Sequence, residues 1–166
     1  MAACLPSARA GMRDGARIVS NWMDWIEQRF GVRDAGEDAA RGRDLAVAAL
    51  LVEVLRADYD TSFAERRQVI EAIGGLLALD ASACEALLAE AEQSVDRAHD
   101  LHQFTSQLNE SLSHREKLAL MEQLWRVAHA DEAVHKYEEH LIRRVADLLH
   151  VSHREFIAAK LRVGGA

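Results

Sequence analysis

Between Arg43 and Val163 the chain has no proline and only two glycines, Gly74 and Gly75. Proline lacks a backbone N–H and breaks a helix, and a glycine inside a helix costs about 1 kcal/mol relative to alanine. A stretch of this length with so few of either residue favours helices. No segment in it alternates apolar and polar residues as a half-exposed strand would. The sequence therefore predicts an all-α fold.

Apolar residues recur along this stretch at intervals of three and four positions, the period of a helix that buries one face. The Ser-His-Arg-Glu segments at 113–116 and 152–155 have the pattern of a capping box, in which serine caps a helix start and glutamate bonds back to it. Asp80 is a further candidate cap. Gly74 and Gly75 lie inside a predicted helix, so we expect another helix to pass close to them. Five predicted helices cover residues 43–57, 62–78, 81–98, 101–108 and 136–149. Two more begin at residues 113 and 152.

The N-terminal segment differs from this stretch. Residues 1–17 hold the only proline, with scattered glycines and arginines, and we interpret them as a mobile tail. Residues 18–30 predict an amphipathic helix with Trp22 and Trp25 on its apolar face, and residues 31–42 predict a linker. Such a helix is compatible with docking on a membrane surface. Its polar face carries more acids than bases, however, which favours packing on the main body or on a partner protein.

Composition limits the classes of partner and the compartment. The chain has 166 residues, 49% of them apolar, and a net charge of −7. It can bury one proper core, but it has no electrostatic basis for binding nucleic acid. Cys4 and Cys84 are far apart and outside any metal-ligand spacing, which indicates a reducing compartment. No signal peptide and no membrane span is recognisable, so we expect a cytoplasmic protein.

One pattern of helix, acidic turn and helix occurs twice. The segment ADYDTSFAE places Asp58 seven positions before Glu65. The segment ADEAVHKYE places Asp131 seven positions before Glu138, so both acids recur at an offset of 73 positions. The apolar residues that follow match best at an offset of 72, which makes the repeat imperfect. We interpret residues 43–163 as a bundle of about seven helices with a pseudo-twofold repeat, whose halves cover about 43–99 and 113–163.

Both turns concentrate side chains that bind hard divalent cations. Such cations prefer several oxygen ligands on a tight turn, closed by a glutamate of the next helix. The spacing resembles a shortened calcium loop, although the twelve-residue length and central glycine of an EF-hand are absent. The candidate ligands are Asp58, Asp60, Ser62 and Glu65 in the first turn, and Asp131, Glu132 and Glu138 in the second, with His135 as a nitrogen donor.

Helix capping explains the same residues without any ligand. Ser62 and Glu65 have the spacing of a capping box. His135 and Glu138 have that spacing too, and the helix dipole favours a glutamate in any first turn. Aspartates in turns accept backbone N–H bonds. The spacing alone leaves a cation site and helix capping both open.

No arrangement typical of an enzyme is visible. No serine or cysteine has a recognisable base partner, and no glycine-rich loop could hold a phosphate. The eight histidines are spread over several predicted helices, and we expect most of them to be exposed or at interfaces. Only His129 is close enough to the second turn to join a site there.

Three separated stretches carry a family resemblance. They read ADYD at 57–60, DLHQFTSQLNE at 100–110 and YEEHLIRRVADLLHVSHREFIAAKLRV at 137–163. In order and spacing they resemble the TerB-like (tellurite resistance protein B) family, in its stand-alone bacterial branch, over about 45–163. The resemblance implies an all-helical, pseudo-symmetric cytoplasmic domain associated with tellurite or general chemical stress.

The resemblance also implies a divalent-metal site in the acidic turns. Glu132 stands where the family usually has glycine, and Ala133 lacks the acid found at Asp60. The expectation is therefore weaker for the second turn. The residues that match the family's acidic positions are Asp58, Asp60, Glu65, Asp131 and Glu138.

These observations favour a non-catalytic binding or scaffold module. We expect its acidic turns to bind Ca²⁺, Mg²⁺, Mn²⁺ or Zn²⁺ and its helical surface to dock protein partners. The alternative is a metal-dependent enzyme or a handler of tellurium oxyanions that uses the same turns. The acidic turns and the lack of a thiol pair speak against direct capture of an oxyanion. The metal, the partner, the formation of a homo-oligomer and the relevance of tellurite stay open.

Overall fold

The computed structural model describes residues 35–57, 62–130 and 134–165. In these ranges all regular structure is helical, as the sequence predicted, with seven helices and no strand. The chain divides into two compact units, residues 1–38 and 39–166, and the packing below concerns the second. The helices are α2 (Ala35–Leu55), α3 (Phe63–Leu77), α4 (Ala81–Arg97), α5 (His102–Ser111), α6 (His114–Ala128), α7 (Lys136–Leu148) and α8 (His153–Gly164).

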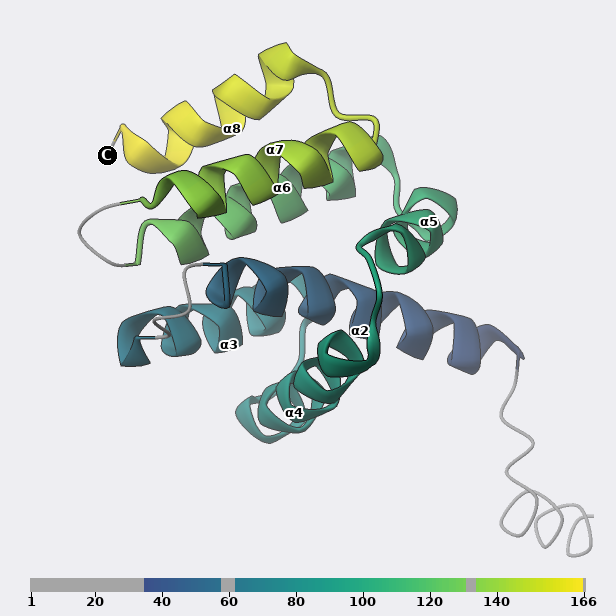
Figure 1. Cartoon of the computed structure of the whole chain (residues 1–166). Helices are drawn as coiled ribbons and strands as arrows, with labels where there is room; N and C mark the ends of the chain where they lie inside the picture. Colours follow the sequence, from purple (N-terminus) through teal and green to yellow (C-terminus); the bar gives the residue numbers. More distant parts are fainter. Residues whose placement is uncertain (1–34, 58–61, 131–133, 166) are drawn as a thin grey trace, which may run out of the picture. The chain divides into compact units, whose positions relative to one another are not determined.

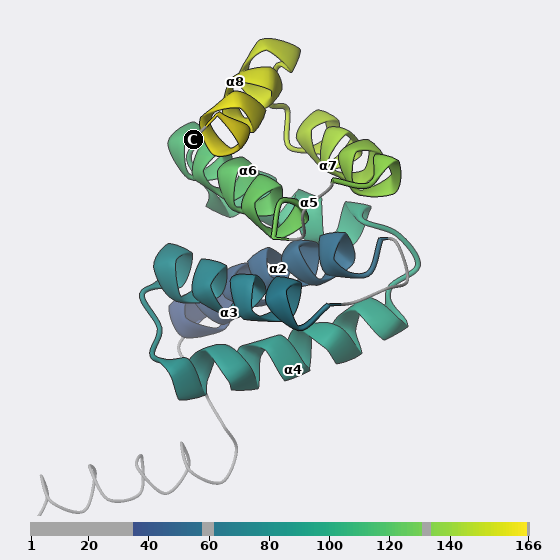
Figure 2. The ribbon, with the colours of Figure 1, turned by 90° about the vertical axis from the view of Figure 1, so that its left-hand side faces the viewer.

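The C-terminal half of α2 forms the centre of the core. Every residue from Ala46 to Val52 is at most 3% exposed, and Val54 and Leu55 are buried as well. A helix that is apolar on all sides is stable in water only when other elements surround it. In Figure 1 and Figure 2, α4 lies on one side of α2, and α6, α7 and α8 lie on the opposite side. The expectation that each helix buries one face is therefore wrong for α2.

The start of α2 also differs from the prediction. Residues 35–42, which the glycines predicted as linker, are helical. Glu37 and Asp38 lie in the first turn, where acidic side chains interact favourably with the positive end of the helix dipole. At Gly42 a β-carbon would lie 2.2 Å from the amide nitrogen of Gln107 on α5. This glycine is a site of close contact between helices rather than a break in one.

Several expectations for the N-terminal segment lie outside the described residues. They are the mobile tail at 1–17, the amphipathic helix at 18–30 and membrane docking through Trp22 and Trp25. Each of them stays a prediction.

One apolar cluster joins the helices of the second unit. Helix α6 contacts α3, α7 and α8, and α5 contacts α7. Trp125 of α6 and Phe156 of α8 are among the largest fully buried side chains. Helices α2, α3 and α4 come in the same order around the first acidic turn as α6, α7 and α8 around the second (Figure 1). A pseudo-twofold relation between the two sets stays a prediction.

The predicted caps at three helix starts are confirmed. The N–H of Glu116 donates to Ser113 Oγ (3.4 Å), and the N–H of Ser113 donates to Glu116 Oε2 (2.8 Å). Ser152 and Glu155 form the same pair of bonds, at 3.4 and 3.0 Å. At the start of α4, the N–H of Ala83 donates to an oxygen of Asp80 at 2.9 Å. These starts depend on residues three positions apart, which explains why the sequence reveals them.

Two helices end on a residue with left-handed backbone geometry. Ala78 follows α3 with φ of 54°, and His150 lies just beyond α7 with φ of 59°. At the end of α7, the N–H of Val151 donates to the carbonyl of Ala146 (2.9 Å) and that of His150 to the carbonyl of Asp147 (3.1 Å). This is a Schellman motif, whose left-handed position favours glycine because glycine lacks a β-carbon.

The two adjacent glycines of α3 have different surroundings. At Gly74 a β-carbon would lie 3.5 Å from the sulfur of Cys84, so α4 passes close by, as expected. At Gly75 a β-carbon would have no neighbour within 4 Å. The expected close approach is therefore wrong at Gly75, which borders a pocket instead.

In the ranges that the structure describes, no single helix is both long and apolar enough to cross a membrane. Helices α3 and α4 reach that length and composition only together, as a pair bent by 110°.

Candidate metal centre

The structure describes part of the predicted cation site. Glu65 lies in the first turn of α3, Glu138 lies in the first turn of α7, and His135 directly precedes α7. The remaining predicted ligands, Asp58, Asp60, Asp131 and Glu132, lie outside the described residues. Convergence of the carboxylates on one cation therefore stays a prediction.

Helix α3 begins with reciprocal hydrogen bonds between Ser62 and Glu65. The N–H of Glu65 donates to Ser62 Oγ at 3.1 Å, and the N–H of Ser62 donates to Glu65 Oε2 at 2.9 Å. Glu65 is only 1% exposed, and both residues take part in further interactions. The predicted capping box is confirmed here, and it holds a carboxylate inside the fold.

Helix α7 begins in a related way. The N–H of His135 donates to Glu138 Oε2 at 2.7 Å. Glu138 is 1% exposed, whereas His135 is exposed. Both residues have further interactions. The glutamate after each acidic turn is thus bonded to the backbone of its own helix start and withdrawn from solvent.

The two other capping boxes provide an internal comparison. Glu116 is exposed, and the side chain of Glu155 is 33% exposed. Hydrogen bonds from Ser113 hold the pKa of Glu116 below its usual value, and bonds from Ser152 and His114 lower the pKa of Glu155 to about 2. Capping by glutamate therefore works at the surface of this fold. The burial of Glu65 and Glu138 is an additional feature of the helices that follow the acidic turns.

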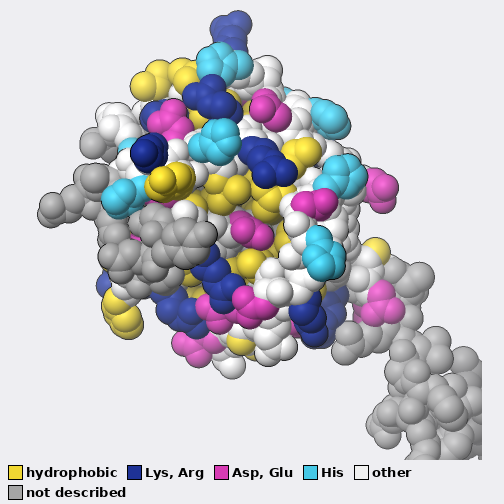
Figure 3. Space-filling view, viewed as in Figure 1, with side chains coloured by type: hydrophobic (Ala, Val, Ile, Leu, Met, Phe, Trp, Pro, Cys, Tyr) yellow, Lys and Arg dark blue, Asp and Glu magenta, His cyan; other side chains and the backbone are white. Residues whose placement is uncertain are grey.

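The histidines supply no ligand cluster in the described ranges. All eight are exposed, which confirms the expectation from their spread along the chain. Figure 3 shows histidines scattered among acidic and basic side chains over one face. His129 lies 6.0 Å, centroid to centroid, from the ring of Trp125. No group of three or more His, Cys, Asp or Glu side chains in this part of the chain is arranged to hold a metal ion.

Comparison with known families connects these turns to a domain type. The family model described as tellurite resistance protein TerB matches residues 44–161. The chain belongs to the TerB family. The match includes all of α3 to α7, so both candidate turns lie within the TerB domain. The resemblance seen in the sequence is thereby confirmed. No curated protein and no solved structure matches the chain.

Three helices of the TerB domain meet around Trp125. Its indole ring lies 5.3 Å from the ring of Phe156, and Lys160 Nζ lies 5.0 Å from the indole centroid. The same ammonium group donates to Glu139 Oε2 at 2.7 Å, and this bond lowers the pKa of Glu139. No sequence pattern indicates this cluster, because its members come from α6, α7 and α8 and no spacing connects them.

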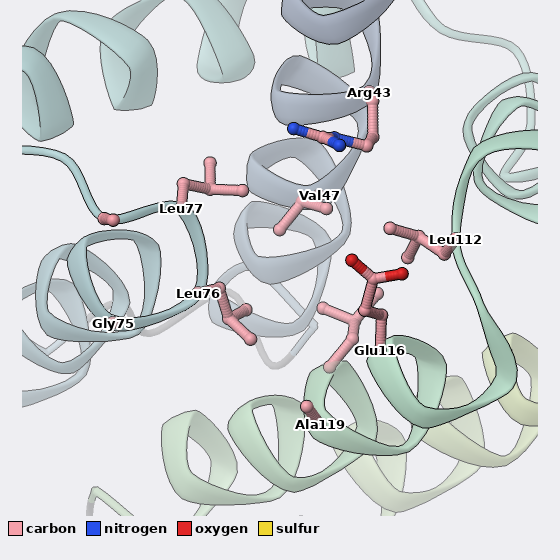
Figure 4. Close-up of a pocket in the computed structure, with 10 residues that line it drawn as sticks. Arg43, Val47, Gly75, Leu76, Leu77, Leu112, Glu116 and Ala119 are labelled. Atoms are coloured by element: carbon pink, nitrogen blue, oxygen red, sulfur yellow. The ribbon is translucent and has the colours of Figure 1, made fainter.

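A pocket of about 340 Å³ opens between α2, α3 and α6 of the TerB domain. Figure 4 shows Arg43 and Glu116 beside apolar side chains that line it. The sequence predicts helix packing at Gly75, which lines this pocket, and no spacing of residues indicates the pocket itself.

Proposed function

We propose that this TerB family member is a non-catalytic binding module whose acidic turns bind a divalent cation. Membership of a tellurite-resistance family supports a role in the response to tellurite or related chemical stress. The proposed ligands are Asp58, Asp60 and Glu65 in the first turn, with Asp131, Glu138 and His135 forming a weaker second set.

The burial of Glu65 and Glu138 is the observation that carries this proposal. Removing a carboxylate from water is costly unless a positive charge or several hydrogen bonds compensate it. Glu116 and Glu155 cap their helices with the same kind of hydrogen bonds while remaining more exposed to solvent. Hard cations bind carboxylate oxygens strongly, so a divalent cation at each turn would add to the hydrogen bonds and other interactions that the two buried glutamates already have.

A cation bound at such a turn would change the surface that a partner protein recognises. It would neutralise acidic side chains between two helices, which changes the charge presented to another protein. The proposal therefore includes protein partners in the cytoplasm that recognise the cation-loaded form. The enzymatic alternative gains no support from the described residues and stays a prediction.

Isothermal titration of metal-stripped protein with Ca²⁺, Mg²⁺, Mn²⁺ and Zn²⁺ tests the proposal. We expect at least one ion to bind with a Kd on the order of micromolar, as calcium sensors do. Asp58→Asn and Glu65→Gln should abolish binding at the first turn. Asp131→Asn should remove any weaker second phase.

Glu116→Gln is the matched control, because it changes a capping glutamate that lies at the surface. It should leave all the binding heats unchanged. Absence of heat with every ion would overturn the cation part of the proposal, and helix capping would then account for both buried glutamates. Circular dichroism of each variant separates a lost ligand from a lost fold.

A further inference from the structure

The pocket between α2, α3 and α6 is built from residues outside the two acidic turns. Its volume of about 340 Å³ is near the lower end of the range for small-molecule sites. In Figure 4, side chains from α2, α3 and α6 point toward a common space. The apolar side chains that line it are Val47, Leu76, Leu77, Ala78, Leu112, Ala119 and Leu120.

Gly75 keeps one wall of this pocket open. It lies in the last turns of α3, where glycine weakens a helix relative to alanine. Its φ is not left-handed, and a β-carbon there would meet nothing within 4 Å. Neither backbone geometry nor a packing neighbour thus requires glycine at this position. The missing side chain leaves space that a larger residue would fill.

Glu116 provides an anionic group at the edge of the pocket. Its Oε2 accepts hydrogen bonds from the N–H and the hydroxyl of Ser113, at 2.8 and 2.7 Å. These bonds, and the nearby charge of Arg43, lower the pKa of Glu116, so the carboxylate is ionised at neutral pH. Its Oε1 has no hydrogen-bond partner among the described residues and can accept from a ligand.

Arg43 provides a cationic group from α2. Its Nε and Nη2 donate to one oxygen of Asp44, at 3.1 and 3.0 Å. Its Nη1 has no partner in the described part of the chain, and the residue binds Asp44 rather than Glu116. The pocket therefore carries one available donor and one available acceptor, of opposite charge, beside an apolar wall.

We propose that this pocket binds a small apolar zwitterion, with the chemistry of a free branched or aromatic α-amino acid. Arg43 would bind the carboxylate and Glu116 the ammonium group. The side chain of the ligand would lie among Leu76, Leu77 and Leu112. A ligand with both charges can pair with both Arg43 and Glu116, whereas a ligand with one charge can pair with only one of them.

An NMR titration of the full chain with three related probes tests this proposal. The probes are L-leucine, 3-methylbutylamine, which lacks the carboxylate, and 4-methylpentanoate, which lacks the ammonium group. We expect L-leucine to shift the amide signals of the lining residues and to bind more tightly than either analogue, by up to about fivefold, the upper limit for one exposed ion pair. Arg43→Gln should remove the preference over the amine, and Glu116→Gln the preference over the acid.

A matched pair of variants tests the location. Gly75→Leu fills the pocket and should abolish the shifts, while Gly75→Ala leaves most of the space and should retain them. Circular dichroism confirms that both variants fold. Equal affinity for all three probes, absence of shifts with every probe, or retained binding in folded Gly75→Leu would each overturn the proposal. None of these outcomes depends on divalent cations, so the cation proposal is tested separately.

Discussion

At the scale of the residue, backbone strain at Ala78 leads to a stability prediction. Its φ of 54° places the β-carbon in an unfavourable position, which glycine avoids. We expect Ala78→Gly to raise the free energy of unfolding by about 0.5–1 kcal/mol, after the greater flexibility of glycine in the unfolded chain is included. Urea denaturation followed by circular dichroism measures the change.

The same substitution inside a helix is the control for Ala78. Ala119 lies in α6 and is exposed, so Ala119→Gly should lower stability by about 1 kcal/mol through helix propensity alone. If both substitutions destabilised the protein equally, the left-handed geometry at Ala78 would not be the controlling factor.

Glu155 leads to a prediction about acid stability. Its pKa of about 2 in the folded protein is below the value of about 4.3 expected in the unfolded chain. The unfolded state therefore binds more protons between these values, and stability falls as the pH drops through this range. Glu155→Gln should make the urea midpoint less dependent on pH between about 5 and 3 than in the wild type.

Ser152→Ala should flatten the same pH dependence, because Ser152 makes the largest contribution to the lowered pKa of Glu155. An unchanged slope in Glu155→Gln would show that other carboxylates control acid unfolding.

At the scale of the element, α2 shows how position within one helix decides the cost of a substitution. Ala48 is fully buried, whereas Ala39 near the start of the same helix is exposed. Ala48→Leu adds three carbon atoms to a filled interior and should cost about 1–3 kcal/mol. Ala39→Leu should change stability by less than about 0.5 kcal/mol, because alanine and leucine have similar helix propensities.

Thermal unfolding of these two variants measures the difference directly. Equal melting temperatures would mean that other helices do not enclose α2 on all sides. The comparison removes helix propensity as a variable, because both substitutions are in one helix.

At the scale of the whole molecule, the apolar cluster predicts one cooperative transition. Cys84 of α4 and Trp125 of α6 belong to the same buried cluster, although they lie on opposite sides of α5 in the sequence. A shared core unfolds as a unit in most domains of this size. We expect urea midpoints from Cys84 labelling and from Trp125 fluorescence to agree within about 0.2 M.

The measurement requires a variant of the protein with a single thiol and a single indole. Cys4→Ser leaves Cys84 as the only thiol, and Trp22→Phe with Trp25→Phe leaves Trp125 as the only indole. Two separated midpoints would show that the halves of the TerB domain unfold independently.

Much of this fold could be predicted from local sequence patterns. The all-helical class, the starts of α4, α6 and α8, and the capping box of Ser62 and Glu65 follow from residues three or four positions apart. Helix hydrogen bonds and caps join near neighbours in the chain, so a short window of sequence contains the relevant chemistry. Family membership follows from longer stretches that agree in order and spacing.

The tertiary structure alone decided what lies against each helix. Residues 35–42 have the composition of a linker but are helical, with Gly42 packed close to Gln107 of α5. Gly75 has the sequence context of a packing position but borders a pocket. Glu65 and Glu116 occupy the same place in the same motif, yet only Glu65 is buried. The physical reason is that burial depends on which distant helices cover a residue, and no local spacing of residues contains that information.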